Sequence, residues 1–192
     1  MKQLLFVLVA ITLFSCKEDS KVEEAVAKIP IEFKVERFDQ VFYQSKPEDL
    51  NKIKAQYPFF FPAGNPDSIW VNKLQNPLLK ELYKEVQMKY PTLGPVEADM
   101  EKMFAYVQYY FPKYKTPRVI TLISEVDTEA KAFYVDTLAL VSLDCYLGKD
   151  HRFYVDFPEY KRAELEENQI LPNLVSTFCY GKIDHIDFLI PH

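Results

Sequence analysis

The segment RVITLISEVDTEAKAFYVDTLALVSLDC, residues 118–145, decides the fold that the sequence predicts. Residues 118–124 are rich in β-branched side chains, residues 132–135 form the short run AFYV, and residues 137–145 form a further apolar run. Short β-branched and aromatic runs separated by acidic and polar residues are typical of strands. We therefore expect three strands that together form a small sheet.

The chain before this segment is predicted to contain one further strand and then a helix. Residues 31–36 alternate strictly between apolar and polar side chains, which is the pattern of a half-buried strand. Ser45 and Glu48 have the spacing of a capping box, in which Ser45 is the N-cap residue. A helix is therefore expected from Ser45 to about Tyr57.

Two longer helices are expected between this helix and the sheet. Asn76-Pro77 predicts a helix start, since proline is favoured at the first helical position. The apolar stripe of this helix consists of Leu78, Leu79, Leu82 and Val86. The next helix follows Gly94-Pro95 and ends before Pro112. Its apolar residues recur at the three- and four-residue spacing of a core-facing helix and are Val96, Met100, Met103, Phe104, Val107 and Phe111.

The order of the predicted elements indicates the fold class. Beyond Pro158 the chain is predicted to be helical again, and the structure of the apolar stretch 170–192 stays open. Helices that precede strands as a group favour α+β over an alternating α/β fold. The expected architecture has N-terminal helices packed on a small antiparallel or mixed sheet, followed by C-terminal helices.

The first sixteen residues predict export and lipid attachment. Lys2 supplies a positive charge, and Leu4 to Phe14 is an almost unbroken apolar run. As a helix of about eleven residues it would measure roughly 16 Å, too short for a bilayer core of about 30 Å but typical of a signal peptide. Leu13-Phe14-Ser15-Cys16 matches the lipobox of bacterial lipoproteins. We expect residues 1–15 to be a signal peptide and Cys16 to be the lipid attachment site. The alternative is an ordinary secretory signal with an incidental cysteine.

The predicted anchor sets the domain boundaries and the location. Residues 16–30 are charged and small, which predicts a flexible tether, and residues 31–192 are expected to form a single globular domain. Several acyl chains on one cysteine give stable membrane attachment. The expected location is the cell envelope, at the inner or outer membrane, in the periplasm or on the surface. Lys17-Glu18-Asp19 resembles the signal for surface export in Bacteroidetes lipoproteins, and an acidic solvated tether is the alternative.

Composition limits the classes of partner. The formal net charge is −5, which gives no electrostatic case for nucleic acid, whose binding needs a basic face. The hydrophobic content of 48% argues for a globular fold with a real core. Besides Cys16 the chain has Cys145 and Cys179. In an oxidising envelope these could pair, or each could be an unpaired, buried small hydrophobe.

Signatures of metal binding and catalysis are sparse. The three histidines are His151, His185 and His192, and no His-Glu-x-x-His pair offers the two helical zinc ligands of a metallopeptidase. Asp184-His185 and Asp187 could form a metal cluster, but no partner histidine stands at a suitable spacing. The sequence has neither a Gly-x-Ser-x-Gly elbow nor a glycine-rich phosphate loop. No catalytic residue, metal or cofactor is therefore expected.

Two other features leave alternatives open. Five aspartates are spread around the predicted sheet: Asp127, Asp136, Asp144, Asp150 and Asp156. Carboxylates at strand ends could perform acid/base chemistry or bind a cation, whereas the alternative is that they cap turns or are solvated. The aromatic runs at 57–61 and 109–111 could form a surface for a ligand or partner, or could belong to the core.

Several segments together resemble the gliding-motility lipoprotein B (GldB) family of Bacteroidetes. Over residues 31 to about 160 the matching segments are Glu36-Arg37-Phe38-Asp39, Val41-Phe42, Tyr57-Pro58-Phe59-Phe60, Tyr109-Tyr110-Phe111-Pro112, Pro117-Arg118-Val119-Ile120 and Phe157-Pro158-Glu159-Tyr160. The most specific is Leu143-Asp144-x-Tyr146-Leu147-Gly148, and its Asp144, Tyr146 and Gly148 are the candidate interaction site. Tyr180-Gly181-Lys182-Ile183 and Leu189-Ile190-Pro191 resemble a later family segment. They follow residue 170 early, so the chain is expected to be shortened at its C-terminus.

The resemblance implies a non-enzymatic envelope lipoprotein that is required for gliding motility and the associated type IX protein secretion. It implies the membrane and other envelope and motility proteins as partners. The family's sheet and following helix are similar to zinc-peptidase-like domains, but ligand histidines are missing near Asn168 to Phe178. The alternatives are an envelope hydrolase that uses strand-end aspartates and a ligand-binding lipoprotein with an aromatic pocket.

Overall fold

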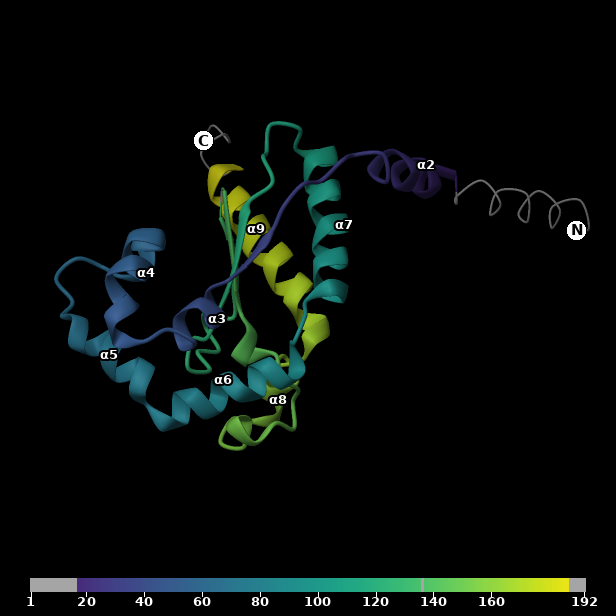
Figure 1. Ribbon diagram of the computed structural model, residues 1–192. Coiled ribbons are helices and arrows are strands. Elements are labelled where there is room, and N and C mark those ends of the chain that lie inside the picture. The colour runs from purple at the N-terminus through teal and green to yellow at the C-terminus, as the bar shows by residue number, and fades with distance from the viewer. Residues whose placement is uncertain (1–16, 136, 187–192) are drawn as a thin grey trace, which may run out of the picture. The chain divides into compact units, whose positions relative to one another are not determined.

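The computed structural model describes residues 17–135 and 137–186 (Figure 1). The chain divides into two compact units. The N-terminal unit contains the residues up to Glu32 together with Val96–Thr116, and the sheet unit contains Phe33–Pro95 together with the residues from Pro117 onward. Each unit is described by itself. The sequence-based boundaries, with a tether over 16–30 and one domain over 31–192, stay predictions.

The N-terminal unit consists of helix α2 (Lys17–Val26) and most of helix α7 (Gly94–Tyr110). The carboxylate of Glu23 on α2 accepts a hydrogen bond from the Tyr106 hydroxyl on α7 at 3.5 Å, and it lies 4.0 Å from Nζ of Lys102. In α7 the predicted residues Val96, Met100, Met103 and Phe104 are buried. The end of the helix before Pro112 is also confirmed. The prediction for Phe111 is wrong, because this ring lies past the last helical turn and is exposed.

The sheet unit is built on four strands in the order β1-β2-β4-β3. They are β1 (Val35–Arg37), β2 (Arg118–Leu122), β3 (Ala132–Val135) and β4 (Leu138–Ser142). β1 pairs with β2 and β2 with β4 in parallel, whereas β3 pairs with β4 antiparallel. The expected mixed sheet in an α+β fold is thus confirmed. The strand predicted over 31–36 is shorter and shifted, because pairing with β2 begins only at Val35.

The order of elements confirms that one strand precedes the helices of the sheet unit, as the alternation over 31–36 predicts. The topology adds that this strand joins the later strands in one sheet. β1 is followed by α3 (Phe38–Tyr43), α4 (Leu50–Gln56), α5 (Asp67–Gln75) and α6 (Pro77–Lys89). Short 3₁₀ turns cover Pro47–Asp49 and Pro58–Phe60.

The two helix starts that the sequence predicts differ in outcome. Asn76 caps α6 as expected, because its Oδ1 accepts the backbone N–H of Leu78 at 2.9 Å. Ser45 does not cap a helix, since its hydroxyl donates back to the Val41 carbonyl at 2.5 Å. The carboxylate of Asp49 instead accepts the N–H of Lys46 at 3.1 Å.

The apolar stripe of α6 is confirmed in part. Leu79, Leu82 and Val86 are buried, whereas Leu78, in the first turn of the helix, is exposed. Three of the four leucine and valine positions therefore form the buried face of this helix.

The C-terminal part of the sheet unit is helical, as predicted beyond Pro158. It contains 3₁₀ turns at Leu143–Cys145, Arg152–Tyr154 and Glu167–Gln169, the short helix α8 (Glu159–Arg162) and the long helix α9 (Ile170–Ile186). α9 runs alongside the strands (Figure 1). It contacts β3, where Oγ1 of Thr177 accepts the N–H of Tyr134 at 2.9 Å and the rings of Tyr134 and Phe178 lie 4.9 Å apart.

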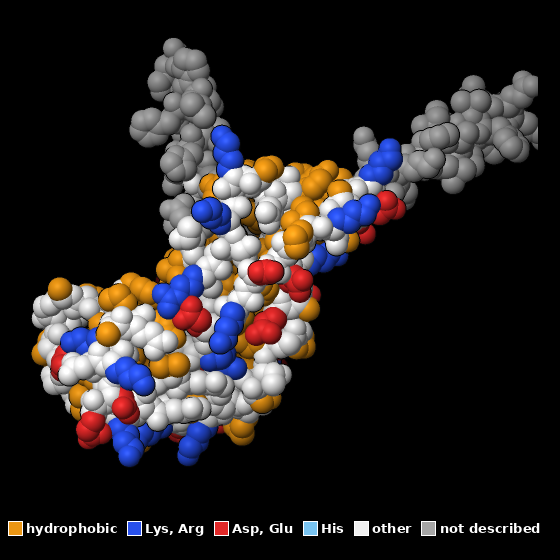
Figure 2. Space-filling view, turned by 45° about the horizontal axis from the view of Figure 1, so that its top comes forward, with side chains coloured by type: hydrophobic (Ala, Val, Ile, Leu, Met, Phe, Trp, Pro, Cys, Tyr) orange, Lys and Arg blue, Asp and Glu red, His pale blue; other side chains and the backbone are white. Residues whose placement is uncertain are grey.

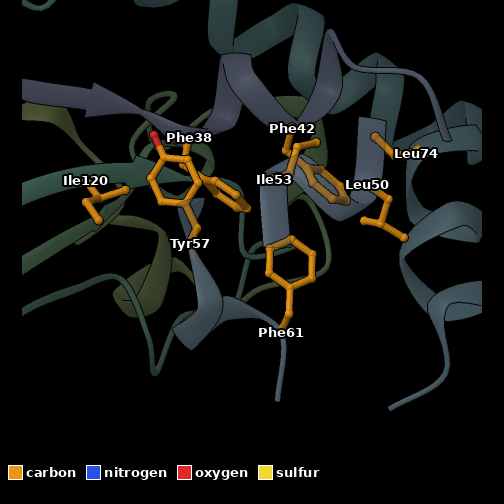
Figure 3. Packing of buried hydrophobic residues seen from close by; sticks show 8 residues of the cluster. All are labelled: Phe38, Phe42, Leu50, Ile53, Tyr57, Phe61, Leu74 and Ile120. Carbon is orange, nitrogen blue, oxygen red and sulfur yellow. The ribbon is translucent and has the colours of Figure 1, made fainter. Parts of the chain in front are cut away.

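An aromatic cluster fills the space between β2 and helices α3 to α5 (Figure 3). The ring of Phe38 lies 4.9 Å from that of Tyr57 and 4.3 Å from that of Phe60, and Phe61 packs edge-on against Trp70 at 4.8 Å. Such tilted and edge-to-face pairs are the favoured arrangements of aromatic rings. The aromatic run 57–61 therefore belongs mainly to the core, and the Phe59 ring remains exposed.

Candidate functional site

The three parallel strands place polar residues at one edge of the sheet. β1, β2 and β4 run in the same direction, so their carboxyl ends meet at the same edge. Two residues past the end of each strand stand Asp39, Ser124 and Asp144, respectively. The crevice outside the carboxyl ends of parallel strands is where open sheets commonly bind ligands. This edge is therefore the candidate functional site.

Asp39 is fully buried at this edge and accepts hydrogen bonds from three side chains. Arg37 donates Nε to Oδ1 at 3.0 Å and Nη2 to Oδ2 at 2.8 Å. Thr121 on β2 donates its hydroxyl to Oδ1 at 2.6 Å, and Gln87 on α6 donates its amide to Oδ2 at 3.0 Å. Both carboxylate oxygens are thus occupied, and the group links β1, β2 and α6.

The remaining donors of the Asp39 network are also satisfied. Arg37 donates Nη1 to the backbone carbonyl of Tyr90 at 3.1 Å. Gln40 on α3 donates to Oε1 of Gln87 at 2.7 Å, which fixes the orientation of the Gln87 amide. A buried ion pair whose polar atoms are all bonded stabilises one arrangement of the surrounding elements.

Asp144 is also fully buried, and its carboxylate holds the loop that follows β2. Oδ1 accepts the backbone N–H of Ser124 at 2.9 Å, and Oδ2 accepts that of Val126 at 2.6 Å. Glu125 and Val126 both have positive φ, of 64° and 59°. This conformation is unfavourable for residues other than glycine, above all for a β-branched valine. The carboxylate therefore stabilises a loop conformation that the sequence alone disfavours.

Burial raises the pKa of Asp144 to about 6, while the hydrogen bonds from Ser124 and Val126 act in the opposite direction. Perturbed carboxyl groups are common in active sites. Here the carboxylate is enclosed by backbone donors. Its environment is that of a loop anchor.

The other two residues of the sequence motif support the segment after β4. Tyr146 is buried; its carbonyl accepts the Tyr90 hydroxyl at 2.6 Å, and its hydroxyl accepts the side-chain amide of Asn173 at 2.9 Å. Gly148 has a φ of 114°, which only glycine adopts readily. Its N–H donates to the Leu165 carbonyl at 3.0 Å. Asp144, Tyr146 and Gly148 thus lie close in sequence and together bind four other segments, at residues 124–126, Tyr90, Leu165 and Asn173.

A pocket of about 210 Å³ opens beside Asp39 and Ser124. Its walls are mainly aromatic and come from Phe38, Phe42, Tyr43, Phe60 and Trp70. On its rim Lys73 forms an ion pair with Glu125, and its ammonium lies 5.9 Å from the centre of the Trp70 ring. Sites for small molecules usually measure about 300–1,000 Å³. This pocket is smaller, and its only carboxylate, that of Asp39, is already hydrogen-bonded to three side chains.

Opposite charges lie side by side on the face shown in Figure 2. Arg118 forms a bidentate pair with Glu36 at 2.5 and 2.7 Å, and its guanidinium lies 5.3 Å from the centre of the Tyr57 ring. Arg152 binds both Glu81 and Glu85. Much of the surface charge is therefore paired locally.

The structure does not gather the five strand-end aspartates into one site. Asp127 is exposed and caps a turn by accepting the N–H of Glu129 at 3.0 Å. Asp150 is exposed 3.7 Å from Arg162, and Asp156 is exposed. Asp136 lies outside the described residues. Of the four of these aspartates that the structure describes, only Asp144 has its carboxylate at the carboxyl edge of the sheet.

The two cysteines differ from each other. Cys145 is buried as expected, and burial raises the pKa of its thiol. The expectation of a buried side chain is wrong for Cys179, which is exposed on α9, and both thiols are free. Cys16, the predicted lipid attachment site, lies outside the described residues.

In the part of the chain that the structure describes, no group of three or more His, Cys, Asp or Glu side chains lies close enough together to hold a metal ion. The ring of His151 lies 3.4 Å from Glu85 and stacks on Phe153. Asp187 and His192 are beyond the described range, as is the segment 189–191. In residues 17–135 and 137–186, no helix is both long and apolar enough to cross a bilayer.

Fold and site together define a class: a mixed α+β protein in which two buried carboxylates at the carboxyl edge of the sheet hold its elements together. The model of the family described as gliding motility protein GldB matches residues 19–186. The chain belongs to this family, which confirms the resemblance seen in the sequence. A search of curated proteins gave no match, and neither did a search of solved structures.

Proposed function

We propose that this chain is an envelope lipoprotein, anchored by lipid on Cys16, that gliding motility and the associated type IX protein secretion require. The family match over residues 19–186 carries this proposal. The lipobox at Leu13-Phe14-Ser15-Cys16 supports the anchor, since several acyl chains on one cysteine hold a protein stably at a membrane.

The same proposal assigns the chain a non-enzymatic role. A general acid or base must be able to reach the proton that it transfers. The carboxylates of Asp39 and Asp144 are each enclosed by donors from their own fold. Both groups are suited to holding the molecule in one conformation, and this supports a role in binding other envelope and motility proteins.

The test is complementation in the host. The gene is deleted, and plasmids encode the wild-type chain, Cys16→Ala and Asp144→Asn. Colony spreading and secretion of a type IX cargo are scored, with the protein level measured by immunoblot. We expect the wild type to restore both activities and Cys16→Ala to restore neither. A deletion strain that spreads and secretes normally would refute the proposal.

One observation favours a second candidate, a ligand-binding lipoprotein. The pocket at the carboxyl edge is aromatic and partly enclosed, as a site for an apolar group would be. Its volume of about 210 Å³ limits the occupant to a small ring or an amino acid side chain. Trp70→Ala would enlarge the pocket and alter such binding. If this variant complements fully at a normal protein level, the pocket has no role in motility.

A further inference from the structure

The end of helix α7 carries exposed aromatic rings next to lysines. Tyr109, Tyr110 and Phe111 are all exposed, and Tyr110 has 60% of its surface accessible. A turn follows the helix, in which the N–H of Tyr114 donates to the Phe111 carbonyl at 2.9 Å. We call residues 109–115, with Lys113 and Lys115, the aromatic-lysine patch.

Ring contacts join the aromatic residues of this patch in two pairs. The rings of Tyr109 and Tyr110 lie 5.0 Å apart, and those of Phe111 and Tyr114 lie 5.8 Å apart. Monomeric proteins rarely expose aromatic groups together unless these contact a partner or a membrane.

The sequence segment that carries the patch differs in charge from the whole chain. Residues 102–118 contain no Asp or Glu, although the chain has a net charge of −5. The first turns of α7, in contrast, carry Glu97, Asp99 and Glu101. Helix α7 is therefore acidic at its start and aromatic at its end, and Lys113 and Lys115 follow shortly after its last residue.

Helix α2 contacts this end of α7. Glu23 binds the Tyr106 hydroxyl, and Tyr106 stands one helical turn before Tyr110. The two helices lie in the same compact unit, and α2 adjoins the upper end of α7 in Figure 1. Glu23 is six positions after Lys17, which is about 9 Å of helix at 1.5 Å per residue. The residue before Lys17 in sequence is Cys16.

We propose that the aromatic-lysine patch is a second membrane contact, which binds the anionic headgroup region of the bilayer that holds the lipid anchor. Tyr rings favour the boundary between water and acyl chains, and lysines there bind anionic phospholipid headgroups. The acidic start of α7 then points away from the membrane. This inference rests on the lipid anchor proposed above.

The test uses the mature lipidated protein in vesicles of phosphatidylethanolamine and phosphatidylglycerol with brominated acyl chains. The chain has one tryptophan, Trp70. Two variants share Trp70→Phe and each carry one new probe, Tyr110→Trp in the patch and Glu97→Trp at the acidic start of the same helix. Circular dichroism checks that both are folded, and flotation checks that both are anchored.

We expect the emission of Tyr110→Trp to shift to shorter wavelength and to be quenched about two-fold by the brominated chains, because its ring enters the interface. The emission of Glu97→Trp should stay unchanged. Adding Lys113→Glu and Lys115→Glu, both at exposed positions, should relieve the quenching at position 110. If the protein floats but the Tyr110→Trp probe is not quenched, or if both probes are quenched equally, the patch does not contact the membrane. Such a result would refute the membrane contact and leave the lipid anchor intact. Protein that does not float would overturn the anchor and the patch together.

Discussion

Replacing Asp39 by alanine removes the acceptor on which three buried donors converge. Arg37, Gln87 and Thr121 come from three parts of the chain and bind the two oxygens of this carboxylate. The side chain of Arg37 is only 15% exposed, so its positive charge would stay largely buried without its counterion. Free energy of unfolding should therefore fall sharply.

The size of the loss in stability follows from the buried donors that Asp39→Ala leaves without an acceptor. Removing one partner of a buried ion pair typically costs about 3–5 kcal/mol. Arg37 keeps its bond to the Tyr90 carbonyl, which lowers the cost, but Thr121 and Gln87 each lose an acceptor. An unsatisfied buried donor costs about 1–3 kcal/mol, less if water enters the space. We expect Asp39→Ala to lose about 4 kcal/mol.

Urea unfolding measures this loss through the fluorescence of Trp70, which packs against Phe61 in the core. With a slope of about 2 kcal/mol per molar urea, the midpoint should fall by about 2 M. The matched control is Asp67→Ala, which breaks the exposed pair with Lys54 and should cost at most about 1 kcal/mol. If the two variants lose the same stability, the buried network does not hold the sheet unit together.

Three further predictions concern the same part of the molecule. The raised pKa of Asp144, about 6, means that the folded state binds its proton more tightly than the unfolded state. The contribution of this group to the free energy of unfolding should rise by about 1.3 kcal/mol as the pH falls from 7 to 5. Urea unfolding at several pH values should show this rise for the wild type and not for Asp144→Asn. An equal dependence on pH in both proteins would contradict the raised pKa of Asp144. Tyr154→Phe removes a buried hydroxyl that accepts the Leu147 N–H at 2.9 Å and donates to the Asp144 carbonyl at 2.5 Å. Calorimetry should show a loss of about 2 kcal/mol, against none for the exposed control Tyr160→Phe. Gly148→Ala should lower the free energy of unfolding by about 1–3 kcal/mol, because alanine is strained at a φ of 114°. The control Gly94→Ala should be tolerated, since an added Cβ meets no atom there. If Gly148→Ala does not change the stability, the turn can relax.

Local patterns in the sequence are sufficient to predict those strands and helices that are determined by their own residues. The runs at 118–122 and 132–135 are strands, because β-branched and aromatic side chains suit a pleated, half-buried surface. Asn76-Pro77 starts α6 because both residues act within one turn. β1 was placed too early, since the alternation over 31–36 extends beyond the three residues that actually find partners on β2.

The candidate site was only partly predictable because its contacts join distant segments. Asp144 could be placed near a strand end, but its role depends on the backbone of Ser124 and Val126. Asp39 stood in a family motif, yet its donors Gln87 and Thr121 are 48 and 82 positions away. No local pattern indicates such a pairing. A charged residue between Phe38 and Phe42 was the one available signal that a buried partner was needed.

The parallel pairing of β1 with β2 also governs when the newly made chain can fold. β1 has no strand partner among the residues between 38 and 117 that the structure describes, and Asp39 lacks its Thr121 donor until residue 121 has appeared. Closing a loop of this length is slow compared with forming a helix. The sheet unit therefore cannot complete its fold until β2 and the strands after it have been synthesised. With the export that we propose, this delay would keep the sheet unit unfolded while the chain passes through the translocation channel.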